Sequence, residues 1–323
     1  MDVLDEILAS LRLTGGVVID GGFSGEFCVH AEFTPEHCAP FFPLPDTLIS
    51  YHYVRSGRLL IQIDDQPAVT LEAGSIAILP RNDPHMLCSQ SGLPPAEVDE
   101  IGWVTDEGVH HVAAGTKGQR AEVWCGFLGT AKSSSHPILD ALPALLTLNV
   151  SHGQAQWLDS SMRFVAEQNP PSETVARLSE LLLSQAIREY VERLPAEEQG
   201  WLRGLADPAI SKALSIIHQR YAEDLDVEGI AREVGMSRSV LGERFTELLG
   251  EPPMRYCAKW RMTMAANMLR DGKQNSANIA YAVGFNSEAA FNRAFKREYG
   301  EPPATWRRKI ELESQGVEEV TAA

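Results

Sequence analysis

The sequence lacks any apolar run long enough to cross a membrane and any secretory signal at its start. Spanning a bilayer takes about 20 consecutive apolar residues, and no stretch of the 323 residues approaches that length. The segment from Met1 to Leu13 carries Asp2, Asp5 and Glu6, where a signal peptide would begin with basic residues. We therefore predict a cytoplasmic protein with no membrane partner.

Cysteine is scarce, and its spacing argues against two common uses of the residue. The five cysteines are odd in number and widely spaced, and none forms a Cys-x-x-Cys pair. This pattern disfavours a disulfide framework or a zinc finger and predicts reduced thiols. A second interpretation stays open, in which Cys28 and Cys125 lie close together on strands and act as an oxidant-sensitive pair. Inert burial is favoured, because no basic residue adjoins either thiol to lower its pKa.

Positive charge is also in short supply, which at first argues against nucleic acid as a partner. The chain has 28 Lys and Arg against 44 Asp and Glu, a net charge of −16. The deficit lies in residues 1–206, whereas residues 207–310 hold 16 basic against 13 acidic residues. An acidic tail, residues 311–323, follows. This split is typical of a sensor joined to a nucleic-acid-binding domain, so the composition permits DNA binding.

Short β-like segments broken by turn residues fill the region from Gly15 to Leu128. They are Leu48–Val54, Leu59–Ile63, Ala68–Leu71, Ser75–Leu79 and Ala121–Leu128. Tight polar turns between such segments are typical of hairpins, so we predict an antiparallel β-barrel or sandwich. The protein is expected to be of the α+β class, with a sensor and dimerisation domain in residues 1–200.

After Ser135 the apolar residues recur with a helical period. The predicted helices are Pro137–Leu148, Ala155–Gln168 and Ser172–Leu194. The last of these has an apolar stripe wider than one neighbour would cover. Two interpretations remain open: the helix caps the β domain, or it forms a homodimer interface.

The last hundred residues contain a duplicated segment. Ile230-Ala231 and Val234-Gly235 recur 49 residues later, and Gly250-Glu251-Pro252-Pro253 recurs 50 residues later. Such a repeat indicates two copies of one supersecondary unit. Each copy is predicted as a helix, a glycine turn and a second helix. The four helices are Val227–Val234, Arg238–Leu249, Ala277–Val283 and Glu288–Tyr299.

Two helices joined by a glycine turn are typical of the helix-turn-helix, whose second helix enters the major groove of double-stranded DNA. Arg and Asn read guanine and adenine edges, Glu accepts from cytosine, and Lys suits phosphate. The candidate DNA-binding residues are Arg238, Ser239, Glu243, Arg244, Ser287, Glu288, Asn292, Arg293 and Lys296. Gly242 offers no side chain to read a base, so we expect specificity to lie mainly in the second unit.

This region closely resembles the C-terminal domain of AraC/XylS transcription regulators. The resemblance rests on residues 279–287, on residues 291–296, and on Gly300, Pro303 and Trp306-Arg307. It implies an all-α DNA-binding domain in residues 207–310, with Pro253–Leu269 as the rigid helix between two reading units. RNA polymerase is an expected partner, and whether the protein is an activator or a repressor stays open. The sequence departs from the family where Glu243 occupies a position commonly filled by Arg, with Arg244 one place later.

The N-terminal region resembles the cupin sensor domains of such regulators. Gly74-x5-Pro80-x4-His85 is similar to the second cupin motif, but the first motif lacks the paired histidines and carboxylate of a metal site. We therefore expect no metal, no cofactor and no enzyme activity. The candidate contacts for a small-molecule effector are His52, His85, Trp103 and Trp124. The alternative is a metal-dependent cupin enzyme with an appended DNA-binding module.

Overall fold

The computed structural model describes most of the chain in two compact units. The described residues are 13–34, 47–101, 104–106, 109–130, 137–149, 152–168, 172–194 and 200–310, with Leu4 and Ile7. The β unit comprises Arg12–Lys132 and Leu142–Ala186, and the helical unit comprises Met1–Leu11, Ser133–Ala141 and Ile187–Ala323. The domain limits expected from the sequence stay a prediction, and the acidic tail lies outside the described residues.

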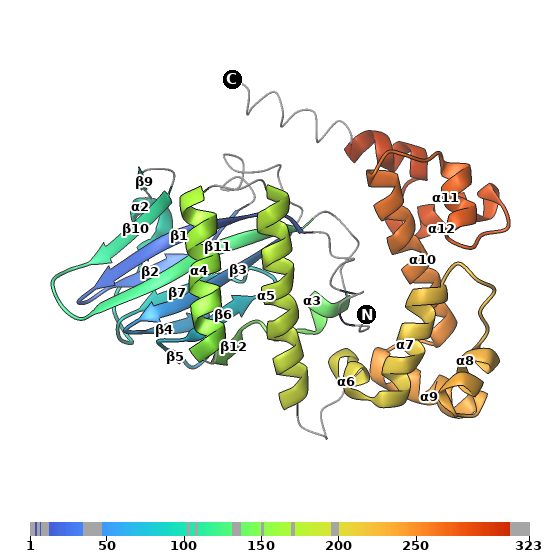
Figure 1. Ribbon diagram of the computed structural model, residues 1–323, viewed down its shortest axis with the longest axis horizontal. Helices are drawn as coiled ribbons and strands as arrows, with labels where there is room; N and C mark the ends of the chain where they lie inside the picture. Colours follow the sequence, from blue (N-terminus) through green and yellow to red (C-terminus); the bar gives the residue numbers. More distant parts are fainter. Residues whose placement is uncertain are drawn as a thin grey trace. The chain divides into compact units, whose positions relative to one another are not determined.

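Two β-sheets make up the β unit (Figure 1). The seven-stranded sheet has the order β12-β6-β3-β11-β1-β10-β9, and the five-stranded sheet has the order β5-β4-β7-β2-β8. The strands are β1 (Leu13–Ser24), β2 (Cys28–Ala31), β3 (Thr47–Ser56), β4 (Arg58–Ile63), β5 (Val69–Glu72), β6 (Ser75–Leu79), β7 (His85–Cys88), β8 (Ala96–Glu97), β9 (Val104–Asp106), β10 (Val109–Gly115), β11 (Arg120–Thr130) and β12 (Leu146–Asn149).

The sheets correct the expectation of an antiparallel barrel, because the barrel is not closed and two strand pairs are parallel. Strand β1 pairs with β11 in the antiparallel sense and with β10 in the parallel sense. Strands β10 and β11 run in opposite directions, so a strand inserted between them must be parallel to one of the two. Strands β2 and β8 form the second parallel pair.

A hydrophobic core fills the space between the two sheets. Val54, Val123 and Phe127 of the seven-stranded sheet and Ile61 and Leu87 of the five-stranded sheet belong to this cluster. Alternation along the strands places these residues inward. Helices α4 (His152–Gln168) and α5 (Ser172–Arg193) run along the other face of the seven-stranded sheet (Figure 1). The shorter helix α2 (Val98–Ile101) follows β8.

The predicted helix Pro137–Leu148 is wrong in its second half. Helix α3 (Pro137–Ala141) ends after five residues, and Leu146–Asn149 forms β12 beside β6. Pro143 explains the break, because a proline disfavours helical geometry in the residue before it. The apolar residues in the second half of this segment therefore belong to an edge strand of the seven-stranded sheet and not to a helix.

From residue 200 onward the helical unit is built of the helices named next, and residues 303–310 are helical as well. The named helices are α6 (Trp201–Ala206), α7 (Pro208–Arg220), α8 (Val227–Val234), α9 (Arg238–Leu249), α10 (Pro253–Arg270), α11 (Ser276–Ala282) and α12 (Glu288–Tyr299). The carboxylate of Asp207 caps α7 by accepting from the backbone N–H groups of Ala209 and Ile210. Helix α8 ends at Gly235, whose φ of 77° is left-handed and suits a residue without a Cβ.

Candidate nucleic-acid interface and sensor site

Both predicted recognition helices start at a serine cap and turn an apolar face inward. The hydroxyl of Ser237 accepts from the Val240 N–H at 3.3 Å, and that of Ser287 accepts from the Ala290 N–H at 3.2 Å. Ser287, which is also among the predicted DNA contacts, therefore caps α12. Phe245 on α9 and Phe295 on α12 are fully buried, which leaves the opposite face of each helix toward solvent.

Most of the predicted DNA contacts lie on these outward faces. Arg238, Ser239, Glu243, Glu288, Arg293 and Lys296 are exposed. Asn292 is only half-buried, and its Oδ1 is buried without a hydrogen-bond partner in the structure. The sequence interpretation overlooked Val240, which is 48% exposed in the first turn of α9. An apolar side chain there suits a thymine methyl group.

Arg244, another of the predicted DNA contacts, forms an ion pair within the protein. Its guanidinium donates to the carboxylate of Asp207, the buried residue that also caps α7. A charge-assisted hydrogen bond to a buried carboxylate holds a side chain firmly. Arg244 therefore ties α9 to the start of α7, a role that sequence spacing could not reveal because the two residues lie 37 positions apart.

The sensor candidates His52 and His85 meet between the two sheets. Their Nε2 atoms are 2.7 Å apart, the His85 Nδ1 lies 2.9 Å from the Asp83 carbonyl oxygen, and the Cys125 Sγ lies 3.2 Å from the His52 Nδ1. The carbonyl can only accept, so His85 donates from Nδ1 and accepts at Nε2. His52 must then donate from Nε2 and accept from the Cys125 thiol. The result is one continuous hydrogen-bond chain in which the thiol and both imidazole rings are neutral.

Burial keeps this chain uncharged. It lowers the pKa of His85 to about 4, and the pKa of His52 falls well below its usual range through burial and the nearby His85. Burial also raises the pKa of the Cys125 thiol to about 12. A thiol that stays protonated is a poor nucleophile, so Cys125 does not have the character of a reactive cysteine.

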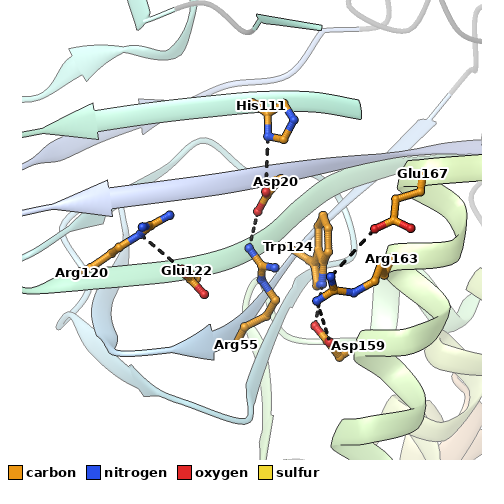
Figure 2. Close-up of polar contacts among 9 residues, drawn as sticks. All are labelled: Asp20, Arg55, His111, Arg120, Glu122, Trp124, Asp159, Arg163 and Glu167. Atoms are coloured by element: carbon orange, nitrogen blue, oxygen red, sulfur yellow. Dashed lines mark hydrogen bonds and ion pairs between the residues drawn. The ribbon is translucent and has the colours of Figure 1, made fainter. Parts of the chain in front are cut away.

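Trp124 does not join the two histidines. It lies on the face of the sheet toward α4, where its Nε1 donates to Asp159 at 3.0 Å and the Arg55 guanidinium stacks 4.2 Å from its ring centroid (Figure 2). Asp20 in turn pairs with Arg55 and lies 3.3 Å from the His111 Nδ1. Trp124 therefore anchors a polar network. Trp103 lies outside the described residues.

The structure does not pair Cys28 with Cys125, the alternative left open above, and the favoured expectation that Cys28 is a reduced thiol is wrong. Cys28 on β2 lies directly opposite Cys88 on β7, and the two form a disulfide. A groove of about 400 Å³ runs over this disulfide. Its other lining residues are Leu60, Gln62, Ala68, Met86, Ser91, Gly92 and Leu93. Cys88 was missed because the pairing of two strands 60 residues apart leaves no local signal in the sequence.

Comparison with known families decides what these two units are. Residues 2–192 match a family model described as "Cupin", and residues 230–309 match one described as "Helix-turn-helix domain". The chain belongs to the AraC/XylS regulators with an N-terminal cupin domain. The predicted resemblance to both families is thereby confirmed, and the regulator is a DNA-binding transcription factor.

Curated relatives of the regulator align along nearly its whole length. A putative AraC-like transcription regulator of Streptomyces antibioticus is 28% identical, over 95% of this chain and 99% of the relative. The regulator AlkR of Acinetobacter baylyi is 26% identical, over 96% and 100%. ToxT from Vibrio cholerae, solved with an unsaturated fatty acid, aligns over 92% of this chain and 95% of its own at 13% identity. The TM-score of 0.34 is too low to support any inference.

Two further observations bear on the alternative of a cupin enzyme. Among the described residues, no group of three or more His, Cys, Asp or Glu side chains is placed to hold a metal ion. The relatives cited above, which align along nearly the whole chain, are named transcription regulators. Within the described part of the chain, none of the helices combines the length and apolar character needed to cross a membrane.

Proposed function

We propose that the regulator reads operator sequence through α12 and anchors itself through α9. The exposed Arg293 guanidinium on α12 carries this proposal, because a bidentate Arg contact to guanine is the commonest specific contact in the major groove. On α9 the corresponding face presents Glu243, which repels phosphate, and Gly242, which has open space where a Cβ would lie. The two helices therefore contribute unequally to specificity.

A randomised-site selection with the full-length protein tests this assignment. The operator selected by the wild type is compared with those selected by Arg293→Ala and Glu243→Ala. We expect Arg293→Ala to relax the preference at one or two base pairs and Glu243→Ala to keep the wild-type site. The reverse result would make α9 the reader.

We propose that the controlling signal is the redox state of Cys28 and Cys88. The disulfide supports this, because disulfides in a DNA-binding protein of the cytoplasm are usually transient and regulatory. Oxidation by hydrogen peroxide joins the two sulfurs, while two protons and two electrons convert the peroxide into two water molecules. Two molecules of a small thiol in the groove reverse the step and leave as their own disulfide.

A small-molecule effector is the second candidate, favoured by an apolar cavity beneath the helices. It lies between the seven-stranded sheet and α4 and α5, with Tyr51, Met162 and Leu183 among its lining residues. Its volume of about 30 Å³ is close to that of one water molecule. An effector would therefore have to separate the helices from the sheet, whereas the disulfide already lines an open groove.

Binding to the selected operator in reducing and oxidising buffers separates the two signals. We expect wild-type affinity to change about tenfold or more between buffers, and Cys28→Ser and Cys88→Ser to abolish the difference. Cys257→Ala, in the helical unit, is the control. Unchanged wild-type binding in both buffers would refute redox control and favour the effector.

We further propose that the regulator is a homodimer that activates RNA polymerase at its promoters. Trp157 and Phe164 lie seven residues apart on α4 and are 48% and 47% exposed, and Leu181 on α5 is 58% exposed. Large exposed apolar side chains on two helices suit a self-complementary contact between two copies. Light scattering on the wild type and on the double variant Trp157→Ser/Phe164→Ser tests this. We expect a dimeric wild type and a monomeric variant, and a monomeric wild type would contradict the proposal.

A further inference from the structure

Arg261 on the linking helix α10 contacts both helix-turn-helix units at once. Its Nε donates to the Tyr221 carbonyl at 2.6 Å, and its Nη2 donates to the Glu223 carbonyl at 2.7 Å, where α7 ends. Its Nη1 donates to the carbonyl of Gly284 at 3.4 Å, in the turn of the second unit. One side chain thus joins the first unit, the linking helix and the second unit.

The same junction is closely packed. Gly284 has a φ of 82°, and a Cβ built on it would lie 2.7 Å from the Ala222 carbonyl oxygen. The Tyr221 ring packs against the core of the second unit, which includes Val283 and Phe291. The short segment 221–223 belongs to the first unit by sequence, yet it is held between α10 and the turn of the second unit.

We propose that Arg261 is a positioning residue that sets the distance and angle between α9 and α12, and so the half-site spacing that the regulator accepts. A guanidinium is planar and carries five donors in a fixed arrangement, so three carbonyl groups bound to it are held in a defined geometry. A lysine ammonium on a flexible chain cannot fix them in the same way. The inference rests on the proposed use of both helices on DNA, and it goes beyond it by naming what fixes their separation.

Half-site spacing is a sensitive readout of this geometry. One inserted base pair moves the half-sites apart by about 3.4 Å and rotates them by about 35°. A rigid pair of helices meets this change only by deforming the DNA, which lowers affinity. If the junction is weakened, the two recognition helices can shift to follow the new spacing. The affinity lost on changing the spacing should then become smaller, which is a different result from weaker binding alone.

The experiment uses the full-length protein and the operator that it selects from random DNA, with one base pair inserted or deleted between the half-sites. We expect the wild type to lose about tenfold or more in affinity on either change. Arg261→Lys and Arg261→Gln should shrink that penalty to about threefold or less, even where they bind the original operator more weakly. Gly284→Ala should act in the same direction by pushing the turn away from Ala222.

Arg255→Gln is the matched control, because Arg255 lies on the same helix but is largely exposed and pairs with Glu251, within the first unit. It should keep the wild-type spacing penalty. A wild-type penalty in both Arg261→Lys and Gly284→Ala, with folding confirmed by circular dichroism, would overturn the proposal, as would a wild type indifferent to spacing. If Arg293→Ala keeps the wild-type sequence preference while the Arg261 variants still shrink the spacing penalty, only the assignment of α12 as reader fails.

Discussion

The two helix-turn-helix units share one internal construction but differ on their outer faces. In both, the recognition helix ends at a left-handed glycine, Gly250 or Gly300, and a proline starts the next helix. In both, an aromatic ring of that next helix packs edge-on against the buried phenylalanine of the recognition helix. The centroid distance is 5.7 Å from Tyr256 to Phe245 and 5.5 Å from Trp306 to Phe295.

The outer faces of the two recognition helices differ at matching positions of the repeat. Glu243 on α9 and Arg293 on α12 occupy the same place in the repeat and carry opposite charge. Arg244, which pairs with Asp207, corresponds to Ala294 in the second unit. Buried positions must fill a fixed volume, whereas exposed positions are free to follow the DNA. The comparison separates the residues that build the unit from those that choose its target.

The largest expected effect tests the shared interior. Phe245→Ala and Phe295→Ala should each lower the free energy of unfolding by about 3–5 kcal/mol, because both rings are fully buried. The two losses should agree within about 1 kcal/mol if the units are equivalent. Denaturant unfolding followed by circular dichroism measures them, with the exposed Val240→Ala as the control. A much smaller loss in one unit would show that the interiors have diverged too.

The next effect concerns base reading. Arg293→Ala should cost about 1–3 kcal/mol of binding free energy on the preferred operator and far less on unrelated DNA. Glu243→Ala, at the matching place, should leave affinity unchanged or raise it, because a charge that repels phosphate is removed. Fluorescence anisotropy on both DNAs gives the two values. Equal losses from both variants would remove the asymmetry between the units.

A smaller effect is expected from two residues that we predict to contact phosphate. Arg238→Ala on α9 and Lys296→Ala on α12 should weaken binding to all sequences alike and reduce the slope of log affinity against log salt by about one. The measurement is a salt titration of binding to operator and random duplexes. A loss confined to the operator would instead make either residue a base reader.

The smallest expected effect is a gain in stability. Gly242→Ala should raise the free energy of unfolding by about 0.5–1 kcal/mol, since a mid-helix glycine is unfavourable and the space that a Cβ would take beside α9 is open. Thermal unfolding of the variant beside the wild type measures the gain. Destabilisation would mean that the absent side chain has a structural purpose in α9.

How far the sequence predicts the structure depends on how local the signals are. The bounds predicted for α8, α9 and α12 coincide with those observed, because the capping residues Asp226, Ser237 and Ser287 and the glycine stops act within a few residues. The segments predicted as strands match β3, β4, β5, β6 and β11, but β1 was not predicted, and no partners could be assigned, since β1 pairs with segments about 100 residues away. The Cys28–Cys88 disulfide and the Arg244–Asp207 pair were missed for the same reason. The choice of bases by α12 stays a prediction.

The insertion of β1 between β10 and β11 has a consequence for how the protein is made. Strand β1 leaves the ribosome first, yet its two partners end only at Gly115 and Thr130. Until then a twelve-residue strand with both edges unpaired persists in the nascent chain, and such edges invite pairing with other chains. Pairing between such distant segments is also slow. The yield of folded regulator in the cell should therefore depend on the chaperones that cover its first strand during synthesis.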